Sequence, residues 1–92
     1  MMTVDALQAA MRDGRLQPAE AARLTAEELT ARNASGNTPL HSAAKYGLLK
    51  FLAPAVLTRE NLLLKNDAGY TPLHHAAFGG FLFLSTLYLQ EV

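Results

Sequence analysis

The stretch that decides the fold of this chain is Thr38-Pro39-Leu40-His41-Ser42-Ala43-Ala44-Lys45-Tyr46-Gly47. It recurs 33 residues later as Thr71-Pro72-Leu73-His74-His75-Ala76-Ala77-Phe78-Gly79-Gly80. Each copy opens with a threonine suited to a helix N-cap and a proline suited to the first helical position, where a missing N–H costs nothing. Apolar residues follow at helical spacing, and a glycine suits the end of the helix. The two copies therefore predict two equivalent short helices.

The 33-residue offset extends well beyond these two stretches and predicts a repeat protein. Identical residues at this offset include Leu24 and Leu57, Asn33 and Asn66, and Gly36 and Gly69. A weaker copy lies another 33 residues upstream, where Leu7 falls on Leu40, Ala10 on Ala43, Gly14 on Gly47 and Leu16 on Leu49. We expect a single domain, residues 1–92, made of a degenerate N-terminal capping repeat (1–23), a repeat (24–56), and a repeat with an apolar C-terminal helix (57–92).

The segments that join the predicted helices read as turns and short helices. Residues 33–36 and 66–69 are turn sequences in which glycine supplies a backbone angle that other residues avoid. Thr25 begins a capping-box pattern that opens a short helical turn. A second helix is expected near Leu48, but Pro54 must end or kink it. Helix is predicted throughout, with minimal strand.

Composition excludes several classes of protein. Half of the 92 residues are hydrophobic, which is too many for a disordered chain. Eight basic residues are balanced by eight acidic ones, which argues against a nucleic-acid partner. No cysteine is present, so neither a disulfide nor a thiolate metal site can form. The N-terminus does not read as a signal peptide, and the longest apolar run, residues 81–84, is far short of the ~20 residues of a membrane span. We expect a cytoplasmic protein with no membrane contact.

The 33-residue period with its Thr-Pro-Leu-His-x-Ala-Ala-x-x-Gly core resembles the ankyrin repeat. The resemblance covers about residues 24–92, with a weak extension to the N-terminus. It implies an all-α ankyrin-type helical solenoid of about three repeats. Residues 51–58 depart from the usual pattern, because they lack the long aliphatic run ending in Gly-Ala-Asp. They are similar to a variant of the repeat in which proline shortens the second helix.

The resemblance implies a scaffold that binds another protein through its hairpin tips and the exposed face of its first helices. Fold analogy is the only basis for this function. Tyr46, Tyr70 and Phe78 would form an aromatic patch on that face, and aromatic residues are favoured interface anchors. The alternative is that these rings only pack on neighbouring repeats. The full set of expected partner-binding residues is Ser35, Asn37, Ser42, Lys45, Tyr46, Asp67, Tyr70, His75 and Phe78.

Neither a metal, a cofactor nor catalysis is expected. The resemblance gives His41 and His74 a structural role, hydrogen bonding within and between repeats, while a zinc site needs three or four convergent ligands. His75 is expected to make a surface contact. The sequence has no cysteine nucleophile and no glycine-rich phosphate loop. Its only carboxylate pair, Glu27 and Glu28, fits a helix cap.

The apolar C-terminal run, residues 81–89, is the main anomaly. Soluble repeat arrays end in a unit with a polar outer face, yet Phe83 stands here where Lys50 stands in the previous repeat. The chain could be a fragment of a longer ankyrin array, the face could join two copies, it could dock a partner, or the helix could fold back. The second functional hypothesis is therefore a self-associating structural protein, a homo-oligomer joined through Phe81, Phe83, Leu84, Leu87 and Tyr88.

Overall fold

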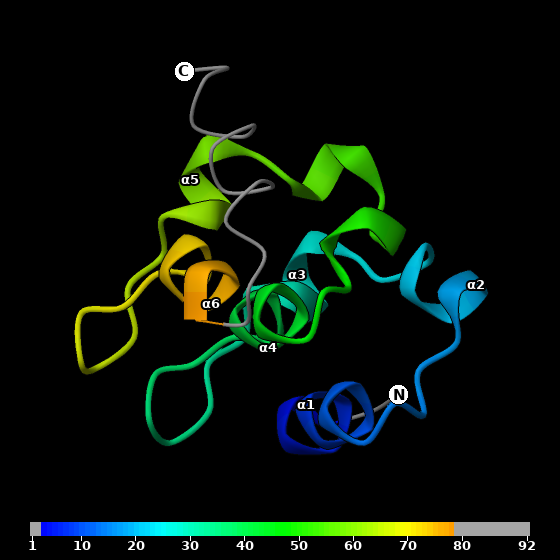
Figure 1. Ribbon diagram of the computed structural model, residues 1–92, viewed down its shortest axis with the longest axis horizontal. Coiled ribbons are helices and arrows are strands. Elements are labelled where there is room, and N and C mark those ends of the chain that lie inside the picture. The colour runs from blue at the N-terminus through cyan, green and yellow to red at the C-terminus, as the bar shows by residue number, and fades with distance from the viewer. Residues whose placement is uncertain (1–2, 79–92) are drawn as a thin grey trace.

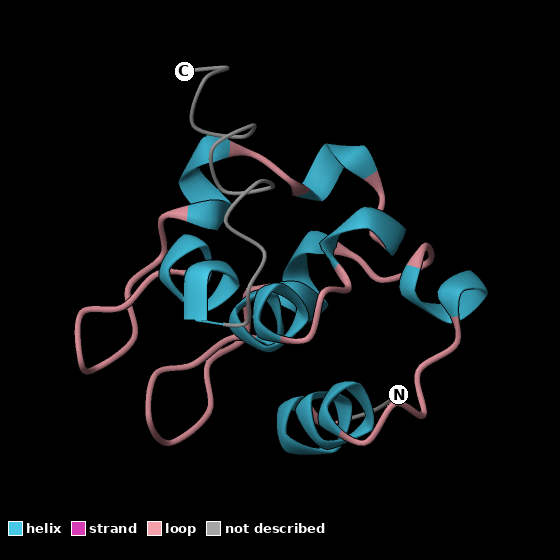
Figure 2. Ribbon diagram, viewed as in Figure 1, coloured by secondary structure: helices cyan, strands magenta, loops and turns pink. Residues whose placement is uncertain are grey.

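The computed structural model describes residues 3–78, and every regular element in that range is helical (Figure 2). The predicted all-α class is thereby confirmed. The expected C-terminal helix lies outside the described residues, as do the five residues proposed for self-association. The elements are α1 (Val4–Arg12), α2 (Pro18–Ala21), α3 (Ala26–Leu29), α4 (Pro39–Lys45), η1 (Leu49–Phe51), η2 (Pro54–Val56), α5 (Arg59–Leu62) and α6 (Pro72–Phe78).

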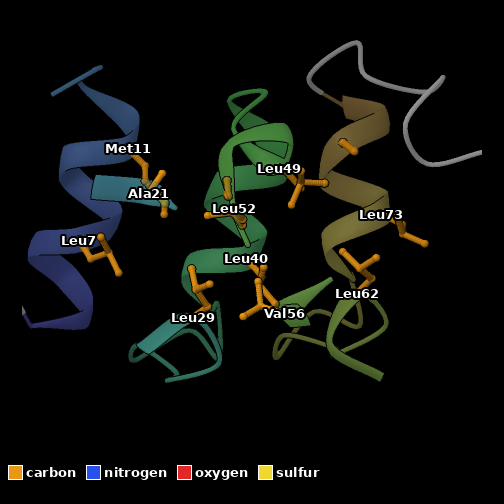
Figure 3. Packing of buried hydrophobic residues seen from close by; sticks show 13 residues of the cluster. Leu7, Met11, Ala21, Leu29, Leu40, Leu49, Leu52, Val56, Leu62 and Leu73 are labelled. Atoms are coloured by element: carbon orange, nitrogen blue, oxygen red, sulfur yellow. The ribbon is translucent and has the colours of Figure 1, made fainter. Parts of the chain in front are cut away.

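The elements form two layers. Helices α1, α4 and α6 lie side by side in one row, with α4 packed against both of the others (Figures 1 and 3). The shorter elements form the second layer, and the two loops that precede α4 and α6 project away from it (Figure 1). The row and the projecting loops therefore belong to one side of the solenoid.

Local capping explains why α4 begins where it does. The Thr38 hydroxyl accepts a hydrogen bond from the His41 backbone N–H at 3.3 Å. The imidazole Nδ1 of His41 accepts one from the Thr38 N–H at 3.1 Å, so the two residues form a reciprocal capping box. Pro39 occupies the first helical position. Gly47, with a φ of 75°, adopts the left-handed conformation just after the helix.

The core lies between the two layers. Leu40 is fully buried on α4, together with Leu29 and Leu49 from the second layer (Figure 3). Ala43 and Ala44 are also fully buried, and their small side chains allow neighbouring helices to approach closely. The apolar stripe predicted from sequence is therefore the packed face of α4.

The region of the expected second helix contains two short 3-10 turns. The first, η1, ends at Phe51, and Pro54 occupies the first position of η2. Ala53 is extended, with φ −60° and ψ 133°, because proline disfavours a helical conformation in the residue before it. The expected second helix near Leu48 is therefore replaced by two 3-10 turns, of which the first ends before Pro54 and the second begins at it. The repeat boundaries at residues 24 and 57 stay a prediction.

Candidate functional site

The first projecting loop, residues 32–37, is closed by its own asparagine. The Asn33 backbone N–H donates to the Asn37 carbonyl at 2.9 Å. The Asn33 side-chain oxygen accepts from the N–H groups of Ser35 and Asn37, at 2.9 and 3.0 Å. Gly36 has a φ of 75°, and a Cβ there would lie 2.9 Å from the backbone nitrogen of Asp67. We call this loop the first hairpin.

The second hairpin, residues 65–70, stacks on the first. The Asn66 side-chain Nδ2 donates to Asn37 Oδ1 at 2.7 Å, and the Asp67 backbone N–H donates to the Ser35 carbonyl at 3.1 Å. The guanidinium of Arg32 donates to the Lys65 carbonyl at 2.6 Å. These bonds hold the two tips together, so Ser35 and Asp67 are presented as one surface.

Hydrogen bonds also connect α1 and α4 to the hairpin that follows each of them. His41 Nε2 lies 2.9 Å from the Tyr70 carbonyl, and Gln8 Nε2 donates to the Asn37 carbonyl at 3.2 Å. Gln8 stands 33 residues before His41, so the glutamine amide of the degenerate repeat and the imidazole of the next repeat make the same hydrogen bond to the following hairpin. Ser42 Oγ completes the link between α4 and α1 by donating to Gln8 Oε1 at 2.8 Å.

These bonds fix the protonation state of His41. Its Nδ1 must accept from the Thr38 N–H, and Nε2 must then donate to the Tyr70 carbonyl, which requires the neutral imidazole. Burial lowers the pKa of His41, in agreement with this geometry. The expected bonding of His41 within and between repeats is therefore present. His74 makes the same cap bond with Thr71.

A model of ankyrin repeats, in three copies, matches residues 7–90. The chain belongs to the ankyrin repeat family. The match confirms the resemblance and the predicted solenoid of about three repeats. A search of curated protein sequences finds no match to this chain. Ankyrin repeats are in general protein–protein interaction modules.

The expected binding residues of this ankyrin domain differ in their exposure. Those on the hairpin tips, Ser35, Asp67 and Tyr70, are exposed, and so is Lys45 on α4. Four others are partly buried, namely Asn37, Ser42, Tyr46 and His75. Phe78 is the last residue of α6, and its side chain lies outside the described part of the structure. The predicted aromatic patch of three rings is therefore described only at its two tyrosines.

The two tyrosines have different surroundings. Tyr46 packs partly against the core, and the ammonium of Lys45 lies 5.5 Å from its ring centre. Tyr70 is 44% exposed, the one large hydrophobic residue so exposed within residues 3–78. Its ring makes edge contacts with His74 and His75, at centroid distances of 5.7 and 6.4 Å. Tyr70 is thus held in place by neighbours while much of its surface faces solvent.

His75 is less a surface residue than the sequence suggested. Its side chain is partly buried, and its ring lies edge-on to His41 at a centroid distance of 5.2 Å. Burial lowers the pKa of His75, and the neighbouring ionisable groups His41, Lys45 and His74 act in the same direction. Within residues 3–78 no group of three histidines, acids or cysteines is placed to hold a metal ion.

A groove of about 290 Å³ runs between α1 and α4 beside the first hairpin. Ser42 and Tyr46, two of the proposed binding residues, line it, and its α1 wall was not predicted from sequence. The repeat offset carried one unit further back would have found Arg12, which aligns with Lys45. The complete lining is Asp5, Gln8, Ala9, Arg12, Asn33, Ser42 and Tyr46.

Arg12, which lines this groove, belongs to a small charge network. Arg12 Nε lies 3.1 Å from Asp13 Oδ1, and Arg15 Nη2 lies 3.3 Å from Asp13 Oδ2. The hydrogen bond from Arg12 lowers the pKa of Asp13. Such exposed pairs contribute little to stability, so these side chains can pair with charges of a partner instead.

No helix among residues 3–78 has the length and apolarity needed to cross a lipid bilayer.

Proposed function

We propose that this ankyrin domain is a non-enzymatic interaction module that binds a partner protein through its hairpin tips and the outward face of its first helices. The observation that carries the proposal is the groove between α1 and α4, which has polar walls and an aromatic rim at Tyr46. Concave sites with a few well-placed polar groups are the usual location of ligand contacts. Neither a cofactor nor a nucleic acid is part of the proposal, and the proposed location is cytoplasmic.

The binding set has anchors and supporting polar residues. Tyr70 and Tyr46 are the proposed anchors, because aromatic residues dominate the energetics of interfaces. The Lys45 ammonium adds charge beside Tyr46. The remaining proposed contacts are Ser35, Asn37, Ser42, Asp67, His75 and Phe78.

The test compares surface variants of the same chain in affinity capture followed by titration of the captured protein. Tyr46→Ala and Tyr70→Ala should each weaken binding by about tenfold or more, as expected for interface anchors. Glu60→Ala on α5, in the second layer, is the matched control and should bind as the wild type does. Circular dichroism must show unchanged helix content for all three variants. Equal binding by the tyrosine variants and the wild type would remove the concave face from the proposal.

The alternative function is self-association through the apolar C-terminal segment. Its support is the sequence itself, in which Phe83 replaces the Lys50 of the previous repeat and no basic residue follows Lys65. Light scattering across a concentration series should then show a dimer or larger species. Phe83→Lys should convert that species to a monomer. A wild-type chain that stays monomeric at high concentration would eliminate this alternative.

A further inference from the structure

Each hairpin has an edge that faces the preceding repeat. The two hairpins carry the same backbone and side-chain groups on this edge, but the groups differ in whether they form hydrogen bonds. In the second hairpin three groups bond to the hairpin before it. They are the Lys65 carbonyl, the Asn66 Nδ2 and the Asp67 backbone N–H, with distances of 2.6, 2.7 and 3.1 Å to their partners. This edge is therefore fully paired.

The equivalent groups of the first hairpin are the Arg32 carbonyl, the Asn33 Nδ2 and the Ala34 backbone N–H, each 33 residues earlier. None of the three makes a hydrogen bond within residues 3–78. Among residues 3–78, therefore, two donors and one acceptor on this edge of the first hairpin have no hydrogen-bond partner.

This edge borders open space. Asn33 lines the groove between α1 and α4, where Asp5 and Gln8 form the opposite wall. The Asn33 oxygen is already engaged in closing the hairpin, so its amide nitrogen is the atom left to bind something in the groove. The carboxylate of Asp5 favours a positive charge nearby.

We propose that this edge, formed by Arg32, Asn33 and Ala34, binds a turn or extended segment of the partner protein as if that segment were the preceding hairpin. The partner segment supplies a backbone carbonyl to the Ala34 N–H and a side-chain amide or carboxylate oxygen to the Asn33 Nδ2. An arginine or lysine of the partner donates to the Arg32 carbonyl, with Asp5 stabilising its charge. Adding a segment to an exposed backbone edge is a common mode of peptide recognition.

The contact between the first and second hairpins of the same molecule shows how such a partner segment would bind. There the first hairpin provides all three complementary groups, namely the guanidinium of Arg32, the carbonyl of Ser35 and the Oδ1 of Asn37. A partner turn with the same three groups would reproduce a set of bonds that the fold already makes once. The inference rests on the proposed protein-binding function and specifies which partner segment is recognised.

The chain supplies its own probe. A synthetic cyclic peptide with the sequence of residues 31–38 carries the three complementary groups, and it can be titrated at millimolar concentration into the full ¹⁵N-labelled chain. The Ala34 amide and the Asn33 side-chain amide resonances should shift and saturate. A control peptide with alanine in place of Arg32 and Asn37 should shift neither. If the first peptide also leaves both resonances unmoved, the edge does not bind such a segment and the proposal fails.

Asn33→Asp is the decisive variant, because it keeps an oxygen that closes the hairpin and replaces the amide donor by a carboxylate, which repels the acceptor oxygen of the peptide. It should bind the peptide about five- to tenfold more weakly, as expected for one lost hydrogen bond. Equal affinity would overturn the proposal. Glu60→Ala is again the neutral control.

Hydrogen exchange on the free wild-type chain gives a second test that does not depend on the variant's folding. The Ala34 amide should exchange much faster than the Asp67 amide, and peptide should slow it. Protection of Ala34 in the free chain would mean that the edge is already paired, and the proposal would fall. Loss of partner binding in Tyr46→Ala but not in Asn33→Asp would refute the edge while leaving the proposed function standing.

Discussion

Replacing His41 tests the bonds that connect the second and third repeats. His41→Ala leaves the fully buried Thr38 N–H without its acceptor, and an unsatisfied buried donor costs about 1–3 kcal/mol. It also removes the bond from Nε2 to the Tyr70 carbonyl, with a net contribution of about 0.5–1.5 kcal/mol. The two losses together should lower the free energy of unfolding by about 2–4 kcal/mol. A chain of 92 residues has about 5–14 kcal/mol in all, so the effect is large.

His41→Gln should be milder by about 1 kcal/mol, because the first repeat already shows a glutamine making this bond. Gln8 donates to the Asn37 carbonyl, the equivalent of the Tyr70 carbonyl, at 3.2 Å. His74→Ala is a matched control at the same repeat position. Its side chain is exposed and its Nε2 makes no hydrogen bond within the described range, so only the cap bond with Thr71 is lost.

The assay is urea unfolding followed by circular dichroism at pH 7.5, with the three variants and the wild type compared at equal concentration. The expected order of stability is wild type, then His74→Ala and His41→Gln, then His41→Ala. The reasoning is refuted if His41→Ala costs under about 1 kcal/mol, or if glutamine at this position is no better than alanine.

The remaining predictions concern pH, backbone conformation and core packing. Burial lowers the pKa of His41 and His75 below 6.5, so the folded chain binds fewer protons than the unfolded one and its stability should decrease as pH falls below about 6.5. Thermal melts from pH 8 to pH 5 measure this, and a constant Tm over that range would show that the prediction is wrong. Gly36→Ala should lower the free energy of unfolding by about 1–3 kcal/mol, since φ is 75° and the new Cβ would press on the second hairpin, whereas Gly69→Ala, with φ 85° but nothing within 4 Å of the new Cβ, should cost less. Equal losses for the two variants in chemical unfolding would contradict this prediction. Leu40→Ala should cost about 2–5 kcal/mol, and a loss under 1 kcal/mol in urea would mean that the site collapses around the gap.

The sequence correctly predicted local features within one repeat, such as helix caps and turns. Thr25 and Thr58 were expected to open short helices, and both are N-caps of the helices that follow them. Gly36 and Gly69 were expected in turns, and both have positive φ. These features follow from contacts between residues only a few positions apart, so the chain specifies them without reference to the rest of the fold.

Contacts between repeats were much harder to predict. The groove and its α1 wall depend on how closely α1 approaches α4, which the Ser42 to Gln8 bond joins across 34 positions. His75 was expected at the surface, yet the packing of α6 on α4 places it beside His41. Sequence spacing does not contain these distances, because they are set by the stacking of whole units.

Asn33 and Asn66 separate the two kinds of information. Both follow a basic residue, and the sequence by itself predicted that both open a turn. In the structure each side-chain oxygen closes its hairpin by accepting from the backbone N–H four positions on. Only the tertiary structure decided the fate of their amide nitrogens. Asn66 has a hairpin stacked before it and its nitrogen is bonded at 2.7 Å, while Asn33 faces a groove. The physical reason is that a hydrogen bond between repeats requires a neighbouring unit of the right shape, and identical residues do not have identical neighbours.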